Sequence, residues 1–358
     1  MIAEQLDISI PVVSRVLNGK TDVRASEQTR QRVFEVAQEL GYRPSSAARS
    51  LATGRTMQIA VLVEEPETSA GYINHRQLEI RGLIDAAARH GYRVVVLPLR
   101  RGAQGKQQLE HIISEKLCDG FCLFADSVSE ELLGVLARRE ARCVVVGNVE
   151  IGENAPDLRD FVVHVDVDNE LYARRSVEYL LSLGHERIVW VQAFGEEDQP
   201  HTVRLCAGYA AAMKAAGQTP QFLSWSEDDA ALAAFARSGA ATAAILGGLG
   251  GLMSWVSALR VAGVVLPDEF QLLARLETQE LAHLLMSGQK HYVACHVYDP
   301  RTVESCAGDV LARWVAGEAP RQRTILVPPL PPGKADTIWE EIKDSTFRSA
   351  TNDIFALS

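Results

Sequence analysis

Short apolar runs alternate with helix-forming stretches from about residue 58 to residue 327, and this alternation restricts the fold more than any other feature of the chain. The runs QIAVLVEE, YRVVVLPL, FCLFA and RCVVVGN follow one another in this way. Strands that are apolar on both faces and separated by helices of about ten to fifteen residues are typical of parallel sheets covered by helices. We therefore expect an α/β fold with parallel strands and crossover helices.

The alternation restarts at FVVHVDV, which predicts a second α/β lobe. YVACHVY indicates a return of the chain, and a helix over 301–316 then leads to RTILVPP. The core is placed at 58–328. Within it we expect lobe 1 at about 58–161 and 291–322, and lobe 2 at about 162–290 and 323–340. The polar segment from 330 onward is expected to be peripheral, with 341–358 as a C-terminal extension.

Residues 1–44 have a different pattern, which predicts a small all-α domain. Apolar residues share one helical face over 2–6, and SIPVVSRVLNG at 9–19 predicts a second short helix. A longer amphipathic helix over 29–40 follows Ser26, a residue type that caps helix N-termini well. Three short helices in about forty residues, the first two joined by a tight turn, form a helix-turn-helix pattern.

Charge is distributed unevenly between this head and the rest of the chain. Residues 1–57 contain eight Arg and Lys against six Asp and Glu, a net charge of +2, whereas the whole chain carries −10. The remainder therefore carries −12. An acidic body with a mildly basic head indicates that any contact with a polyanion is made by the head.

Several protein classes receive no support from the residues. No run approaches the roughly eighteen apolar residues of a membrane span, and the N-terminus lacks a secretory pattern, so we expect a cytoplasmic protein without membrane contact. Neither a nucleotide fingerprint nor a nucleophile elbow is present, and GGLGG lacks the dinucleotide spacing, so no enzyme activity or cofactor is expected. The cysteines lack zinc-site spacing, and we expect no metal but buried, reduced thiols at Cys118, Cys122, Cys143, Cys206, Cys295 and Cys306.

Three sequence segments near the N-terminus resemble the lactose-repressor family of bacterial transcription regulators, namely VSRVLNG, ELGYRP and ARSLATGRT. Looser matches, such as RGLIDAAARHGY, GYAAAMKAAG and VAGEAP, extend the resemblance over residues 1 to about 328. It implies a helix-turn-helix head, a hinge helix at 45–57, and a two-lobed core like a periplasmic sugar-binding protein. It also implies a homodimer or tetramer on pseudo-palindromic double-stranded operator DNA, controlled by a small molecule, with sugars among the candidates.

The resemblance places the second helix in the major groove, with its first residues toward base edges. Ile10 and Pro11 stand at those positions and can only pack on a thymine methyl group. Arg15, further along, can bond guanine bidentately. Ser9, Ser14 and Asn18 are candidate phosphate or backbone contacts, which position the helix rather than read the sequence. The alternative is an ordinary packed helix with a solvated arginine.

The same resemblance assigns the hinge helix to SSAARSLATGRT, which has little apolar surface of its own and should be marginal alone. The family inserts a leucine between base steps of the minor groove, and the matching residue is Leu51. The alternative is that Leu51 packs on the core. Arg49 and Arg55 are either phosphate or groove neighbours or simply solvated charges. Relative to the family, Met1 falls inside the first helix, so either translation starts further upstream or the head is shortened.

The family binds its effector between the lobes, and here several of its usual markers are missing. Gly248 and Leu249 stand where an Asn-Asp pair is frequent, and ARLET replaces a Gly-Phe-Asp-Asp turn. Arg204 lies four residues before Gly208 instead of three. Each remaining candidate for effector binding could instead be an ordinary polar group on a surface loop, and Asp168 could equally be a helix cap. These candidates are Asn74, His75, Asn148, Asp168, His201 and Arg204.

The leading interpretation is a transcription regulator, with repression as its expected mode, whose operator affinity depends on a bound small molecule. A ligand-binding protein of the same core fold without a DNA role is the main alternative, and the helix-turn-helix pattern argues against it. A regulator that has lost its effector response is a variant of the first interpretation, because the pocket markers are eroded.

Overall fold

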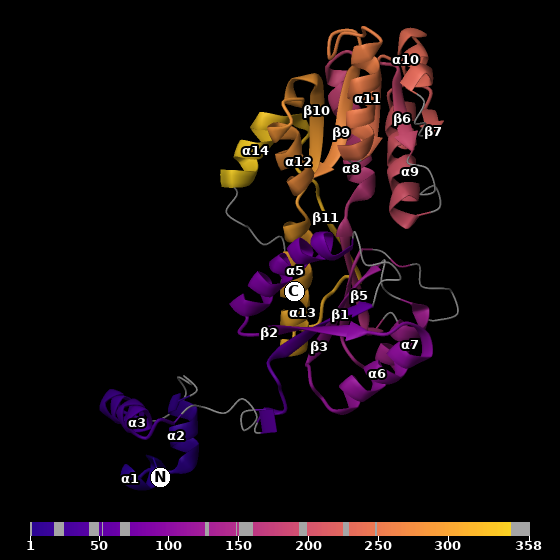
Figure 1. The fold of residues 1–358 in the computed structure, drawn as a ribbon. Helices are drawn as coiled ribbons and strands as arrows, with labels where there is room; N and C mark the ends of the chain where they lie inside the picture. The colour runs from indigo at the N-terminus through magenta and orange to yellow at the C-terminus, as the bar shows by residue number, and fades with distance from the viewer. Residues whose placement is uncertain are drawn as a thin grey trace.

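The computed structural model describes residues 2–17, 25–42, 50–51, 53–64, 72–125, 129–147, 149, 160–192, 199–224, 229–247 and 249–344. A small helical head, lobe 1 and lobe 2 follow one another along the molecule, with the head next to lobe 1 (Figure 1). Within the described ranges, no helix has the length and apolar character needed to cross a membrane. The predicted combination of an all-α head with a two-lobed α/β core is confirmed.

The head contains the three predicted helices, α1 (Ile2–Gln5), α2 (Ile10–Leu17) and α3 (Glu27–Glu39). Ser26 caps α3 as expected, because its hydroxyl accepts a hydrogen bond from the Thr29 N–H at 3.1 Å. The helices meet around a small apolar core in which α2 and α3 contribute most of the buried side chains, namely Ile2, Val13, Val16, Val33, Val36 and Ala37.

Lobe 1 is a six-stranded parallel sheet with helices on both faces. Its strand order is β11-β5-β4-β3-β1-β2. The strands are β1 (Gln58–Glu64), β2 (Arg93–Leu99), β3 (Gly120–Phe124), β4 (Cys143–Val146), β5 (Val162–Val167) and β11 (Thr324–Val327). One apolar layer lies under α5 (Tyr72–Arg89) and α13 (Pro300–Ala316), and the other lies under α6 (Gly102–Ser114) and α7 (Glu130–Arg138).

Lobe 2 repeats this architecture with the strand order β12-β10-β9-β8-β6-β7. Its strands are β6 (Ile188–Gln192), β7 (Gln221–Ser224), β8 (Ala243–Gly247), β9 (Gln271–Glu277), β10 (Val293–Tyr298) and the short antiparallel β12 (Gly333–Lys334). The helices α8 (Asn169–Ser182) and α9 (Pro200–Ala215) cover one face. The other face carries α10 (Asp229–Arg237), α11 (Leu249–Val261), α12 (Thr278–Met286) and α14 (Ala335–Asp344).

The predicted lobe boundaries are wrong at all three crossings of the chain. β5 pairs with β4 and so belongs to lobe 1, β10 pairs with β9 in lobe 2, and β11 returns to lobe 1 beside β5. The chain therefore crosses after each of these strands rather than before it. The physical reason for β5 and β10 is that central strands of a parallel sheet are apolar on both faces, so their sequences do not specify which of two similar sheets they join. β11 is a four-residue edge strand with alternating burial, and so short a run does not specify a sheet either.

The C-terminal segment is less peripheral than predicted. β12 pairs with β10, and α14 buries Ala335 and Ile338 in the core of lobe 2. Residues 345–358, most of the predicted extension, lie outside the described residues. All six cysteines are free thiols: Cys118 and Cys206 are half-buried and the other four are buried. Burial raises the pKa of Cys118 to about 11 and that of Cys295 to about 12, which keeps these thiols protonated.

Candidate nucleic-acid interface and interlobe pocket

The second helix of the head has one covered and one uncovered face. Val13 and Val16 point into the head core and are almost completely buried. Ile10 keeps 75% of its surface exposed, and Pro11 and Arg15 are exposed too. Ser9 and Ser14 are also exposed, and Asn18 lies outside the described residues. The predicted reading face of α2 is therefore accessible, an arrangement that fits both a groove-reading helix and the alternative of an ordinary packed helix with a solvated arginine.

The chemistry of this face is a guanidinium beside an apolar edge. Arg15 lies in the last turn of α2, where a cation is favoured by the helix dipole, and α2 contains no acidic residue. The guanidinium offers several N–H donors in one plane, which suits the acceptor edge of guanine or a phosphate. Ile10 and Pro11 add apolar surface next to it. Together they can contact a polyanion and a methyl group but cannot perform acid–base or nucleophilic chemistry.

Leu51 lies in the short helical segment that joins the head to lobe 1, and 89% of its surface is exposed. The helical turn is closed by a hydrogen bond from the Gly54 N–H to the Ser50 carbonyl at 2.8 Å. The alternative that Leu51 packs on the core is therefore wrong. Arg55 is exposed, and its guanidinium donates to the Ala316 carbonyl at 2.8 Å. Arg49 lies outside the described residues.

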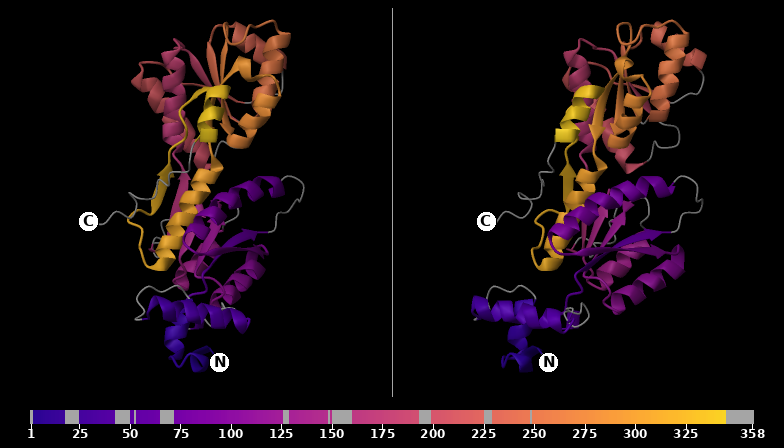
Figure 2. Two further views of the ribbon diagram at one scale, coloured as in Figure 1. Left: turned by 90° about the vertical axis from the view of Figure 1, so that its left-hand side faces the viewer. Right: turned by 60° about the vertical axis from the view of Figure 1, so that its left-hand side comes forward.

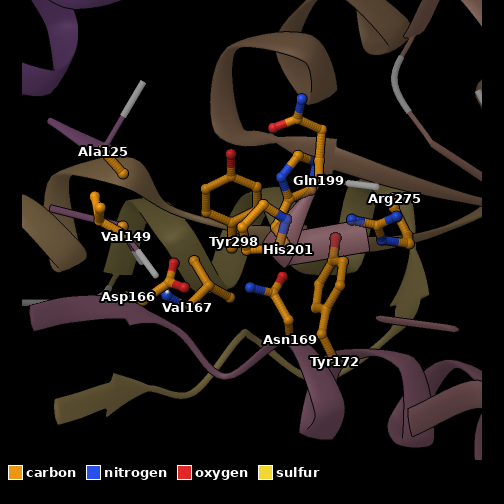
Figure 3. Close-up of a pocket in the computed structure, with 12 residues that line it drawn as sticks. Ala125, Val149, Asp166, Val167, Asn169, Tyr172, Gln199, His201, Arg275 and Tyr298 are labelled. Atoms are coloured by element: carbon orange, nitrogen blue, oxygen red, sulfur yellow. Dashed lines mark hydrogen bonds between the residues drawn. The ribbon is translucent and has the colours of Figure 1, made fainter. Parts of the chain in front are cut away.

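A pocket of about 480 Å³ lies between the two lobes. It opens at the carboxyl ends of β3, β4 and β5 and at the amino ends of α8 and α9, which is where α/β sheets usually bind ligands. Asp166 and Arg275 stand at opposite sides, with Asn169, His201 and Tyr298 between them (Figure 3). The lining residues are Ala125, Gly147, Val149, Asp166, Val167, Asn169, Tyr172, Gln199, Pro200, His201, Arg275 and Tyr298.

An ion pair crosses the pocket wall from one lobe to the other. The Asp166 carboxylate, at the end of β5 in lobe 1, lies 3.5 Å from the Arg204 guanidinium on α9 of lobe 2. Burial raises the pKa of Asp166, although the backbone N–H of Val167 and the Arg204 charge favour its ionised form. This carboxylate is therefore a half-buried acceptor whose charge is matched by a residue of the opposite lobe.

Aromatic rings and fixed polar groups form the lobe 2 side of the pocket. The Arg275 guanidinium lies over two rings, 5.0 Å from the Tyr172 centroid and 5.2 Å from that of Trp190. The Tyr298 hydroxyl donates to the Glu277 carboxylate, and the Tyr172 hydroxyl donates to the His296 carbonyl. Such bonds fix the ring orientations. Flat apolar faces combined with amide, carboxylate and guanidinium groups can bind a small polar molecule in one orientation.

The predicted effector residues have different fates. His201 lines the pocket, and Arg204 reaches its wall through Asp166. Asp168 accepts the Leu171 N–H at 2.9 Å as the N-cap of α8, which confirms the alternative that it is a helix cap. Asn74 and His75 belong to the first turn of α5 rather than to a loop, and their side chains are not among those described. Asn148 also lies outside the described residues.

Sequence reasoning missed most of the pocket. It did not select Asp166, Asn169, Tyr172, Gln199, Arg275 or Tyr298. Asp166 and Tyr298 were detectable in principle, since each is a polar residue at the carboxyl end of an apolar run. Tyr172 and Arg275 carried no comparable signal, because their place depends on how α8 and β9 pack. Among the described residues, no group of three or more His, Cys, Asp or Glu could hold a metal ion.

Two family models match the chain. The model described as bacterial regulatory proteins, lacI family, matches residues 2–45. The model described as periplasmic binding proteins and sugar binding domain of LacI family matches residues 56–238, which is more than half of the chain. The first match covers the helix-turn-helix head, and the second covers lobe 1 through β5 and the first part of lobe 2.

Curated proteins and solved structures agree with these matches. The catabolite control protein A of Priestia megaterium is 29% identical over 219 residues, which span 60% of each chain. The HTH-type transcriptional regulator MalR of Staphylococcus xylosus is 24% identical over 194 residues, 54% of this chain and 55% of the relative. A lac repressor dimer bound to operator and the anti-inducer ONPF has the same fold, with a TM-score of 0.61, 18% identity and coverage of 93% and 96%. A transcriptional regulator CelR–cellobiose complex has a TM-score of 0.57 and 20% identity, and the match covers 92% of this chain and 96% of that chain.

Proposed function

Because the chain belongs to the LacI family of bacterial regulatory proteins, we propose that it is a sequence-specific DNA-binding transcription regulator of the repressor type. Its affinity for a pseudo-palindromic operator is set by a small molecule bound between the lobes, and it acts as a homodimer. The proposal assigns it no catalytic activity. The relative MalR is named an HTH-type transcriptional regulator, and both curated relatives are matched over only 60% or less of their length.

The observation that carries the proposal is the exposure of Leu51. A leucine that is 89% exposed on a short helical segment gains nothing from the fold of this chain. An apolar side chain in that position becomes useful when it inserts between base pairs of a bent duplex, where unstacking is offset by wider contact with DNA. The opposing hinge of a second copy would double the wedge at the centre of a twofold site.

The face of α2 supplies the sequence-reading part of this proposal. Arg15 is the side chain that can distinguish guanine in the major groove, whereas Ile10 and Pro11 favour a thymine methyl group. Ser9, Ser14 and Asn18 are proposed as backbone contacts, and Arg49 as a neighbour of the minor groove. A small polar effector with hydroxyl groups, such as a sugar, suits the pocket, because Asp166, Asn169 and Gln199 offer acceptors and donors beside the Tyr172 and Tyr298 rings.

The experiment is a selection of duplexes from a random-sequence library by the full chain, followed by footprinting of the selected duplex. A twofold-symmetric protected site is expected. Arg15→Ala should weaken binding to the selected duplex about tenfold or more, the value of one good arginine–guanine contact, and weaken random duplexes much less. Arg32→Ala is the matched control, since Arg32 is an exposed arginine on α3.

Two results would count against the proposal. The absence of any salt-sensitive, sequence-preferring duplex would favour the ligand-binding alternative without a DNA role. Equal losses on selected and random duplexes for Arg15→Ala would reduce that residue to a phosphate contact. The effector is sought by a thermal-shift screen of sugars and nucleobases, with Asp166→Asn as the variant that should lose the response. A regulator that binds DNA but responds to no ligand would be the variant interpretation with an eroded pocket.

A further inference from the structure

Arg55 does not point away into solvent but connects two distant parts of the chain. Its guanidinium donates to the carbonyl of Ala316, which lies 261 positions later and is the last residue of α13. The last carbonyls of a helix have no partner within the helix, and a cation is the favoured group at this end. The bond therefore joins the hinge segment to the C-terminus of α13 through complementary charge.

The backbone next to Arg55 is also tied to lobe 1. The N–H groups of Thr56 and Met57 and the Thr56 hydroxyl donate to the Asp119 carboxylate at 2.8 to 2.9 Å. On the other side, the Arg55 N–H donates to the Thr53 hydroxyl at 3.2 Å. Residue 55 thus lies between the part of the chain that Asp119 holds and the segment that carries Leu51. A constraint from these lobe 1 contacts reaches the leucine along the chain through this position.

The helix α13 connects this point with the interlobe crossing. It contains 17 residues and is buried along most of its length, and it runs along lobe 1 from the side of lobe 2 toward the side of the head (Figure 2). Its N-cap, Asp299, follows Tyr298 of the pocket directly. It packs closely against α5, since a Cβ on Gly82 would lie 2.5 Å from the Arg301 carbonyl oxygen.

We propose that Arg55 is a positioning residue that latches the hinge segment to the end of α13, so that Leu51 is presented in register with the core. The proposal rests on the proposed function for the role of Leu51. The latch itself is a property of the protein without DNA. It assigns Arg55 to an internal contact instead of a phosphate contact, and it makes α13 the element through which a change at the interlobe crossing reaches the hinge.

The test compares Arg55→Gln with Arg142→Gln in the full chain. Arg142 is a matched control because its guanidinium donates to the Trp314 carbonyl at the same helix end, at 2.8 Å, but comes from a loop of lobe 1. In hydrogen exchange of the free protein, Arg55→Gln should speed exchange of the peptide 50–57 about fivefold, the value of one net hydrogen bond. Arg142→Gln should leave that peptide unchanged. Equal exchange of the peptide in wild type and Arg55→Gln would overturn the latch.

A second measurement separates a latch from a phosphate contact. With a duplex selected by the wild-type protein, Arg55→Gln should weaken binding a few-fold and leave the slope of log K against log salt unchanged. A fall in that slope by about 0.9, the amount expected for one lost phosphate contact, would overturn the proposal. If no duplex is selected at all, the proposed function fails, whereas the exchange experiment still decides the latch.

A third experiment tests whether α13 connects the interlobe crossing to the hinge segment. Tyr298→Phe removes the hydroxyl that bonds Glu277, at the residue before the N-cap of α13. Tyr298→Phe should change the exchange rate of the peptide 50–57 in the protein that keeps Arg55. It should not change that rate in the Arg55→Gln background, since coupled positions are not additive. Equal effects in both backgrounds, or no effect in either, would overturn α13 as the route.

Discussion

Lobe 1 and lobe 2 share one architecture, a six-stranded sheet between two helix layers, yet they bring different side chains to the pocket between them. Lobe 1 contributes mainly small or apolar residues, with Asp166 as its charged group. Lobe 2 contributes the rings, the amides and Arg275. Lobe 1 in turn carries the contacts to the hinge, through Ala316 and Asp119. Under the proposed function, recognition of a ligand would rest mostly on lobe 2, whereas the response would pass through lobe 1.

The largest expected effect concerns the core of lobe 2. Trp255 is fully buried and stacks on Phe270, so Trp255→Ala should lower the free energy of unfolding by about 3–5 kcal/mol. Its indole N–H has no hydrogen-bond partner among the described residues, so Trp255→Phe should cost less than about 1.5 kcal/mol. Urea unfolding followed by circular dichroism measures both. A single cooperative transition of the circular dichroism signal would show that the lobes unfold together.

Acidification should act through buried histidines of both lobes, most strongly through His296 of lobe 2, since burial also lowers the pKa of His164 in lobe 1. His296 in β10 is buried, and its burial, aided by the Arg275 charge, lowers its pKa to about 3 from 6.5. Between these two pKa values the unfolded chain binds a proton at this histidine that the folded protein does not bind. The free energy of unfolding is therefore unaffected by this group above about pH 6.5, and it falls on acidification toward about pH 3. The expected slope is about 1.4 kcal/mol per pH unit.

The control for this histidine is an exposed one in the same lobe. His296→Asn should flatten the pH dependence of the free energy of unfolding between pH 6 and 4, because asparagine does not titrate, even though the bond to Ser176 is altered. His291→Asn, at an exposed position, should leave the slope as in the wild type. An unchanged slope in His296→Asn would assign the acid sensitivity to other groups.

Close helix contacts test whether the two lobes tolerate the same change equally. A Cβ on Gly82 would lie 2.5 Å from the Arg301 carbonyl oxygen, and one on Gly208 would lie 2.6 Å from that of Glu170. Gly82→Ala and Gly208→Ala should each destabilise by about 1–3 kcal/mol, since backbone must move. Gly134→Ala in α7, whose new Cβ would meet only the flexible end of Arg138, should be neutral or stabilising by up to about 1 kcal/mol.

The smallest expected change in stability, with a visible change in shape, involves the ion pair between the lobes. Arg204→Gln removes the partner of Asp166 and should cost at most about 1 kcal/mol, because both side chains keep some solvent contact. If the pair holds the lobes together, the radius of gyration from small-angle scattering should increase. Arg174→Gln, which removes an exposed pair with Glu178 on α8, should not change it. An equal radius of gyration in both variants would show that the Asp166–Arg204 pair does not hold the lobes together.

Much of the architecture was predictable from local pattern. The alternation of apolar runs and helices predicted the α/β core, and Ser26 and the spacing of Val33 and Val36 predicted α3. These features depend on neighbours along the chain, namely on helix caps and on the period of apolar residues, so the residues themselves carry the information.

The allocation of β5, β10 and β11 to their sheets could not be predicted in this way. The apolar faces of β5 and β10 suit either sheet, and β11 is a four-residue edge strand, so none of the three specifies its partner strand through its own residues. The pocket followed from the same packing, since Arg275 and Tyr172 meet only when β9 and α8 lie in lobe 2 together. Arg55, too, is an ordinary charged residue in the sequence. Its role depends on Ala316, 261 residues away, because a helix end acquires a partner only from what the folded chain places beside it.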